Sequence, residues 1–241
     1  MEPNANGPLA EIEFWRERNA SFAALLEQLK RPDVQHMLNV LAEAKNPVID
    51  NFDMAKSELT KYAIEARENV RFLSTLERHF KNLQHTADFN VIYDTIPSMM
   101  NSLRMVWIIS RHYNKDERMV PLMERIAWQL AERVQMNINI KTIYSHSPQV
   151  VKRITSEAKN CLMTWKASYL EVRAKIEENE RDARWEFDKI KLFGKTDYMA
   201  SICQDIHDVA QVLEEFYNIF GPELKVRLEI ISNLSNKSLY F

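Results

Sequence analysis

Apolar residues recur every three or four positions along most of the chain, which is the spacing that gives an α-helix one apolar face. The first series predicts a helix over residues 9–30, and a shorter helix follows Pro32. The inward positions are Ile12, Trp15, Phe22, Leu26 and Leu29 in the first helix and Val34, Leu38 and Leu41 in the second.

The longest series starts near Pro47 and continues to Phe80. It alternates steps of three and four, which indicates one long helix packed lengthwise on a neighbour. Asn69 is its one polar member. It is either a partly exposed position or a polar contact that fixes the register of the helix pair. The apolar positions are Phe52, Ala55, Leu59, Tyr62, Ala66, Leu73, Leu76 and Phe80.

Two helices are predicted in the middle of the chain, after a loop or short helix at 84–95. Pro97 is expected to open the first of them, because proline is tolerated in the first turn. Its middle, residues 103–109, is apolar nearly all round and is therefore expected to be buried on most sides. The second helix covers 118–144, with Met119, Met123, Ile126, Leu130 and Val134 inward.

Ser147-Pro148 predicts another helix start, with serine at the cap and proline at the first helical position. The charged residues 177–182 are interpreted as a solvated helix face or a turn. The inward positions are Val151, Ile154, Ala158, Cys161, Trp165, Tyr169, Val172 and Ile176.

The last strong helix is predicted to follow a hinge at Gly194, with Asp197 as its cap. Gly221-Pro222 is expected to end it, because glycine permits a left-handed cap and proline cannot continue a helix. The inward positions are Met199, Ile202, Ile206, Val209, Leu213, Phe216 and Phe220.

These series predict an all-α fold, an elongated array of long antiparallel helices in consecutive helical bundles. The chain has 241 residues, 46% of them apolar, and only three glycines, with none between residues 8 and 193. Nucleotide-binding loops and tight hairpin turns need glycine where φ is positive or where backbone approaches a ligand. The sequence therefore argues against most nucleotide-binding and all-β architectures. It shows no fixed-period repeat.

Charge and cysteine content narrow the functional classes. The 32 Lys and Arg residues are interspersed with 34 Asp and Glu residues, so we expect no nucleic-acid partner. The longest aliphatic-aromatic run, residues 105–109, is far too short to span a membrane. The N-terminus lacks a basic region followed by an apolar stretch, and two cysteines cannot form a disulfide framework. A cytoplasmic location is expected.

The sequence contains no recognisable catalytic or metal-binding constellation. Residues 194–196, Gly-Lys-Thr, resemble the end of a phosphate-binding loop, but Lys189 stands where that loop needs glycine. No histidine has glutamate three residues before it, as di-iron bundles require. Cys161 and Cys203 lie on apolar series as small core residues. We therefore expect no catalytic residue, cofactor, metal or small-molecule substrate.

Two groups of aromatic and arginine residues are candidate protein-interface anchors, because Trp and Arg are enriched in interface hot spots. For both tryptophans a core position and an interface position remain open. The candidates are Phe14, Trp15 and Arg16 near the N-terminus and Arg181, Arg184 and Trp185 further along.

Seven long segments carry a family resemblance. They are EIEFWRERN (11–19), NVRFLSTLERHF (69–80), IPSMMNSLRMVWIISRHYN (96–114), ERMVPLMERIAWQLAERV (117–134), EAKNCLMTWKASYLEVRAKIE (157–177), RWEFDKIKLF (184–193) and YMASICQDIHDVAQVLEEFYNIFGPELK (198–225). In collinear order, they resemble the first N-terminal tail region of dynein heavy chains. Among dynein heavy chains, these segments are most similar to those of axonemal heavy chains of the outer-arm type.

The resemblance implies a structural role. A dynein heavy chain tail is an elongated stack of helical bundles that associates with other heavy chains, binds intermediate and light chains, and anchors the motor. By this resemblance the chain would be a non-catalytic scaffold in ciliary, microtubule-based movement, without the ATPase ring. Its expected location is the cytoskeleton and the cilium axoneme.

The same resemblance suggests how the chain is divided. Residues 1–10 are expected to be disordered, 11–225 to form the tail region, and 226–241, an unfamiliar ending, to be poorly ordered. A division of the tail region near 115–148 stays open. Both edges depart from the family pattern, so a fragment of a longer heavy chain is expected. The alternatives are a free-standing cytoplasmic helical adaptor and an enzyme with a helical active site.

Overall fold

The computed structural model describes residues 7–178 and 184–237, and its side chains as far as Gly221. No strand occurs in this part of the chain, so the predicted all-α class is confirmed. The helices are α1 (Pro8–Leu29), α2 (Pro32–Glu43), α3 (Val48–Leu73), the 3₁₀ turn η1 (Ser74–Leu76), α4 (Glu77–His85), α5 (Phe89–Ile109), α6 (Asp116–Asn137), α7 (Ile140–Ile143), α8 (Pro148–Glu178) and α9 (Lys189–Lys237).

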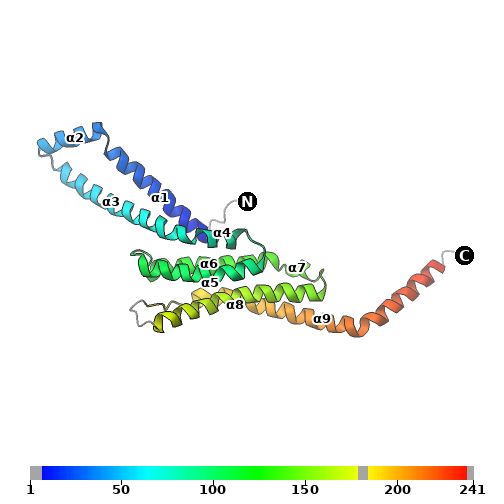
Figure 1. Cartoon of the computed structure of the whole chain (residues 1–241). Coiled ribbons are helices and arrows are strands. Elements are labelled where there is room, and N and C mark those ends of the chain that lie inside the picture. The colour runs from blue at the N-terminus through cyan, green and yellow to red at the C-terminus, as the bar shows by residue number, and fades with distance from the viewer. Residues whose placement is uncertain (1–6, 179–183, 238–241) are drawn as a thin grey trace.

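The helices form an arm and a bundle (Figure 1). Helices α1 and α3 pack side by side as a hairpin, with α2 at its tip. In the bundle α5 packs on α8, α6 packs on α9, and α8 packs on α9 along much of its length. Helix α4 joins the two parts, because it contacts α1, α5 and α6. This arrangement confirms the predicted elongated array.

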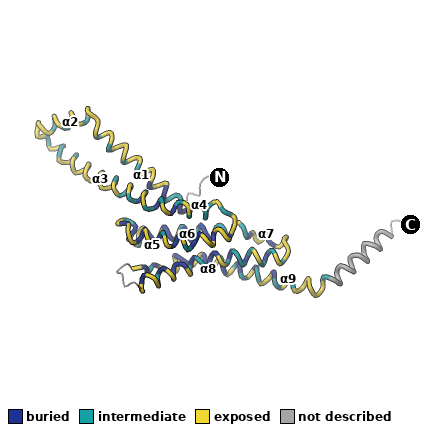
Figure 2. Tube along the Cα trace, in the orientation of Figure 1, coloured by how far each residue is buried: buried dark blue, intermediate teal, exposed yellow. Residues whose placement is uncertain are grey.

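The buried side chains lie in the bundle and at the base of the arm (Figure 2). Helix α2 buries none of its side chains, and α3 buries only Ala66, Asn69 and Leu73. Since α5 packs on α8 and α6 packs on α9, helices before and after residues 115–148 share one continuous core. That core also includes Ile12 and Trp15 of the arm.

The apolar series place most helices correctly. The inward positions predicted for residues 118–134 are all buried, and those in α8 are buried or partly buried. The series that reaches Phe80 does not form one helix, because η1 interrupts it at Ser74–Leu76. Asn69 is fully buried, so the interpretation as a partly exposed position is wrong. Its side-chain amide has no hydrogen-bond partner among the described residues.

Helix α5 differs from its prediction in where it begins and in how far its middle is buried. It begins at Phe89, where the Asp88 carboxylate accepts a hydrogen bond from the Asn90 amide, so Pro97 lies inside the helix. The Asp88 cap pairs a backbone N–H group that has no partner within the helix. Packing on α8 stabilises the helix on both sides of Pro97, where the proline cannot donate a backbone hydrogen bond. Residues 103–109 are not buried on most sides, because Met105 and Ile109 are exposed.

Helix α6 ends earlier than predicted. It stops at Asn137, and the side chain of Asn139 then caps the short helix α7 by accepting a hydrogen bond from the Lys141 amide. Asn is among the preferred N-cap residues, so it starts a new helix here rather than continuing the old one.

The C-terminal helix departs most from prediction. Gly194 lies inside α9 without a positive φ, so it is not a hinge, and Asp188 caps the helix start in place of Asp197. Gly221 also has no positive φ, and α9 continues past it to Lys237. The predicted end at Gly221-Pro222 is therefore wrong, and the segment that begins at residue 226 starts within a helix.

Candidate protein-interaction surfaces

Trp15 belongs to a buried polar contact between the arm and the bundle. Its indole Nε1 donates a hydrogen bond to the Tyr113 hydroxyl at 2.8 Å, and a longer one to Glu11 Oε1 at 3.3 Å. The Tyr113 hydroxyl in turn donates to Glu11. Burial, and then the neighbouring Glu11 carboxylate, raise the pKa of Tyr113. Trp15 therefore joins α1 to the segment between α5 and α6, and it offers no exposed anchor.

Charged residues of α6 surround this contact. Arg125 Nη1 lies 3.1 Å from Glu11 Oε2, and the Arg118 guanidinium lies 5.1 Å from the centre of the Trp15 ring. Arg118 also reaches Glu65 of α3 at 3.2 Å. The base of the arm is thus fixed to the bundle by hydrogen bonds, ion pairs and a cation–π contact.

Arg16 and Phe14 have different surroundings from Trp15. Arg16 Nη2 lies 2.6 Å from Glu77 Oε2, and Lys81 lies 2.9 Å from the same carboxylate. Hydrogen bonds from Arg16 and then Lys81 lower the pKa of Glu77 to about 2. Phe14 packs edge-on against Trp15 and remains exposed. Of the three N-terminal candidates, only Phe14 presents an apolar surface.

Trp185 lies in an aromatic cluster of the bundle core. Its ring centre is 5.1 Å from that of Phe187, 6.0 Å from that of Tyr169 and 6.2 Å from that of Trp107. The Tyr169 hydroxyl accepts a hydrogen bond from the Phe187 amide and donates one to the Trp185 carbonyl. Trp185 is therefore a core residue of the chain, which favours the core position over the interface position.

Of the two candidate arginines near Trp185, the structure describes only Arg184. Arg184 Nη2 lies 2.8 Å from Asp116 Oδ2, in the first turn of α6. Since Trp15 packs under Arg118, both candidate groups contact the start of the same helix. Arg181 lies outside the residues that the structure describes.

Sequence reasoning missed an apolar stripe on α9. Val209, Phe216 and Phe220 were predicted to face inward, but the residues that α9 buries here are Ala200, Cys203, Ile206 and Ala210. The sequence contains a signal for this surface, because further apolar residues recur at helical spacing outside the predicted core positions. We call this surface the α9 stripe: Tyr198, Val209, Val212, Phe216, Ile219 and Phe220.

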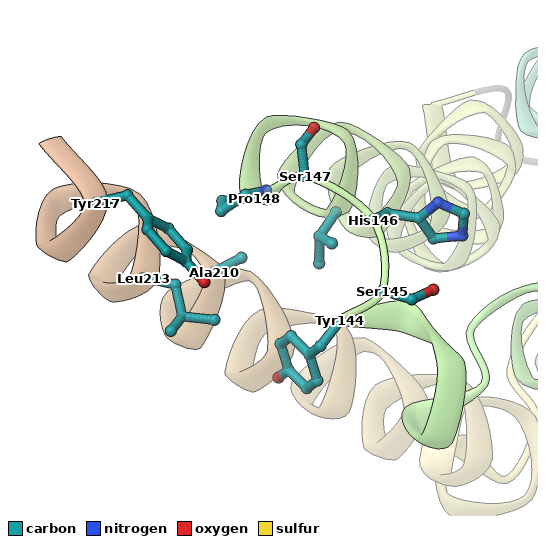
Figure 3. Close-up of a pocket in the computed structure, with 9 residues that line it drawn as sticks. Tyr144, Ser145, His146, Ser147, Pro148, Ala210, Leu213 and Tyr217 are labelled. Atoms are coloured by element: carbon teal, nitrogen blue, oxygen red, sulfur yellow. The ribbon is translucent and has the colours of Figure 1, made fainter. Parts of the chain in front are cut away.

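A cavity of about 310 Å³ lies beside the α9 stripe (Figure 3). It is lined by Leu213 and Tyr217 of α9, by Pro148 at the start of α8, and by Tyr144 and His146 in the connection after α7. Its size is at the low end for pockets that hold small ligands, and it would take one large side chain.

The arm also exposes apolar side chains, and no residue between Trp15 and Ala66 is buried. Two helices have little capacity to cover each other's apolar surface, so part of it remains in water. The exposed residues are Leu25, Met37, Val40, Val48, Met54, Tyr62 and Ile64.

Both cysteines are free and buried. Burial raises the pKa of Cys161 to about 12 and that of Cys203 to about 11, which keeps both thiols protonated at neutral pH. In the described part of the chain, no three His, Cys, Asp or Glu side chains are grouped as a metal site requires.

None of the described helices is both long and apolar enough to cross a membrane.

The described helices form an elongated array that leaves apolar side chains exposed on α9 and on the arm. The model of the family described as "Dynein heavy chain, N-terminal region 1" matches residues 1–239, nearly the whole chain. The chain therefore belongs to the dynein heavy chain family and corresponds to this N-terminal region.

Curated relatives agree with this assignment. The chain is 58% identical to human dynein axonemal heavy chain 10 over 223 residues, 92% of the chain. It is 46% identical over 225 residues, again 92% of the chain, to the dynein-1-alpha heavy chain of the flagellar inner arm I1 complex of Chlamydomonas reinhardtii. The chain spans about 5% of the length of each relative. It is thus homologous to the tails of axonemal dyneins.

The expected outer-arm type gains no support from these relatives. The dynein beta chain of the flagellar outer arm of Chlamydomonas reinhardtii is 29% identical over 224 residues, 92% of the chain and 5% of the relative. That identity is well below the 46% shared with the inner-arm relative.

Proposed function

We propose that this chain acts as a non-catalytic scaffold within an axonemal dynein, where it supports assembly of the motor complex. The observation that carries the proposal is the α9 stripe, a row of exposed apolar side chains on a helix of a dynein N-terminal region. Large apolar surfaces of this kind mark sites of protein association. Heavy chains, intermediate chains and light chains are the proposed partners, and the cilium axoneme is the proposed location.

The surroundings of the reactive groups support a role without catalysis. Both thiols have raised pKa values, and Tyr113 is committed to the contact between arm and bundle. Lys195, the lysine of the phosphate-loop-like sequence, lies inside α9 with its ammonium 4.8 Å from the centre of the Trp128 ring. A helical lysine stacked on an aromatic ring does not form the loop that cradles a phosphate.

The test is an immunoprecipitation from a high-salt extract of axonemes. An antibody raised against residues 157–225 should recover full-length heavy chain together with intermediate and light chains, and the same antibody preabsorbed with the chain should recover none. A product recovered only from cytosol, without any dynein subunit, would overturn the proposal. That result would favour the free-standing adaptor, which no present observation supports over the scaffold.

A further inference from the structure

The α9 stripe has the geometry of one face of an amphipathic helix. Its members lie three, four or eleven residues apart, except for the neighbours Ile219 and Phe220, and this spacing keeps them in one sector of the helix. Val212 and Ile219 are 64% and 66% exposed. Among the described residues, no helix covers these two side chains. The stripe therefore offers a row of apolar contacts to a second helix.

Carboxylates accompany the stripe. Between Tyr198 and Phe220 the chain has four acidic residues and no lysine or arginine. Helical spacing places Asp205 within the stripe and Asp208 and Glu215 along one edge, and all three are exposed. Glu214 faces α8, where Lys152 Nζ lies 2.7 Å away and lowers its pKa. Three carboxylates are thus presented beside the apolar row.

The cavity adds a specific contact at the other edge. Tyr217 lies on α9 beside the stripe and lines the cavity together with Tyr144 and the apolar side chains of Pro148 and Leu213 (Figure 3). An arginine side chain suits such a cavity, because its stem packs on apolar groups and its guanidinium stacks on tyrosine rings.

The charge decides which occupant fits. A second copy of this chain would bring carboxylates against carboxylates, which opposes association. Residues 221–237 do not turn back over the stripe, because α9 continues as a helix to Lys237. A helix from another polypeptide, with lysine and arginine beside its apolar face, would satisfy both the apolar row and the carboxylates.

We propose that the α9 stripe docks a basic amphipathic helix of another polypeptide, with one arginine in the cavity lined by Tyr144 and Tyr217. The inference rests on the proposed scaffold function and specifies the chemistry of one docked partner.

The test uses the full chain and two synthetic helical peptides with the same leucine face, one flanked by lysine and arginine and the other by glutamate. Fluorescence anisotropy should show the basic peptide binding at least about tenfold more tightly, with a preference that falls as salt is added. Phe216→Asp should abolish binding of the basic peptide. The double variant Asp208→Lys/Glu215→Lys should reverse the preference between the peptides.

Matched controls are available on the arm. Met54→Asp introduces the same charge at an exposed apolar position of α3, and Asp53→Lys reverses an exposed carboxylate there. Both controls should bind the basic peptide as the unmodified chain does, and circular dichroism should show equal helix content in all variants.

Three outcomes would overturn the inference. They are equal affinities for the two peptides, α9 variants that bind as the controls do, and a dimer of this chain in sedimentation that Phe216→Asp dissociates. The last result would assign the stripe to a second copy. None of these outcomes affects the recovery of dynein subunits by the antibody. The scaffold proposal is therefore tested independently of this inference.

Discussion

Trp15 and Trp185 both stand beside arginines and acidic residues in the sequence, and both are buried for different reasons. The Trp15 indole N–H is paired with Tyr113 and Glu11. The Trp185 indole N–H has no partner among the described residues, and its ring is held by aromatic packing. The local sequence does not distinguish these cases, because the partners lie far away along the chain.

This difference predicts unequal costs for the same substitution. Trp15→Phe and Trp185→Phe remove the same ring volume, but only the first breaks an indole hydrogen bond, whereas the second removes an unpaired buried donor. Urea unfolding should therefore show Trp15→Phe to be more destabilising by about 1 kcal/mol. Equal losses of unfolding free energy would show that the hydrogen bond to Tyr113 contributes nothing.

A pH dependence is expected from Glu77. Its pKa falls from an ordinary value of 4.5 to about 2 in the folded chain, so its contribution is complete above pH 4.5 and is lost as pH falls towards 2. Because Arg16 and Glu77 are partly exposed, the contribution is at most about 1 kcal/mol.

The measurement compares the unmodified chain with Glu77→Gln in urea at two pH values. At pH 6 the variant should be the less stable, and at pH 3 the difference should shrink. Glu58→Gln, at an exposed position of α3, serves as the control and should change little at either pH. A gap that stays constant between pH 6 and pH 3 would contradict the ion-pair explanation.

At the scale of whole elements, helix ends were harder to predict than helix faces. The apolar periodicity of α6 and α8 depends on neighbouring positions, so it is visible in one sequence. The start of α9 depends on a choice between two aspartates, each followed by residues that can be helical. The hinge predicted at Gly194 and the helix end predicted at Gly221 were wrong, because glycine permits a left-handed conformation without requiring one.

A pair of substitutions tests the corrected start of α9. The Asp188 carboxylate accepts a hydrogen bond from the Ile190 amide, so Asp188→Ala should cost about 1 kcal/mol of unfolding free energy. Asp197 lies inside the helix and makes only a partly exposed ion pair with Lys166. Asp197→Ala should therefore stay within about 0.5 kcal/mol of the unmodified chain. Thermal unfolding of both variants checks this, and the reverse order would restore Asp197 as the cap.

For the candidate site, the sequence analysis missed the stripe, because it assigned half of the members to the core and did not consider the others. Val209, Phe216 and Phe220 belong to an apolar series that begins on the packed side of α9 and drifts onto its exposed side. A series of period 3.5 drifts in this way on a helix of period 3.6. Which side a neighbour covers depends on where α8 begins, and that is a property of the assembled molecule.

For the whole molecule, the uneven distribution of buried residues predicts uneven stability. The arm has no buried side chain between Trp15 and Ala66, whereas α5, α6 and α8 bury one face along most of their length. Segments with few buried apolar contacts open locally at a lower free energy than the core does. Backbone amides in residues 19–64 should therefore exchange hydrogen faster than those in α5, α6 and α8.

Hydrogen exchange followed by mass spectrometry on the full chain measures this directly, and Trp15→Phe sharpens it. The variant weakens the contact that joins the arm to Tyr113, so it should speed exchange in the arm while leaving the middle of α8 unchanged. Arm amides as protected as those of α5 would mean that α1 and α3 stabilise each other without a third helix. Slow exchange in the arm that becomes fast throughout the chain in the variant would mean that arm and bundle unfold as one unit.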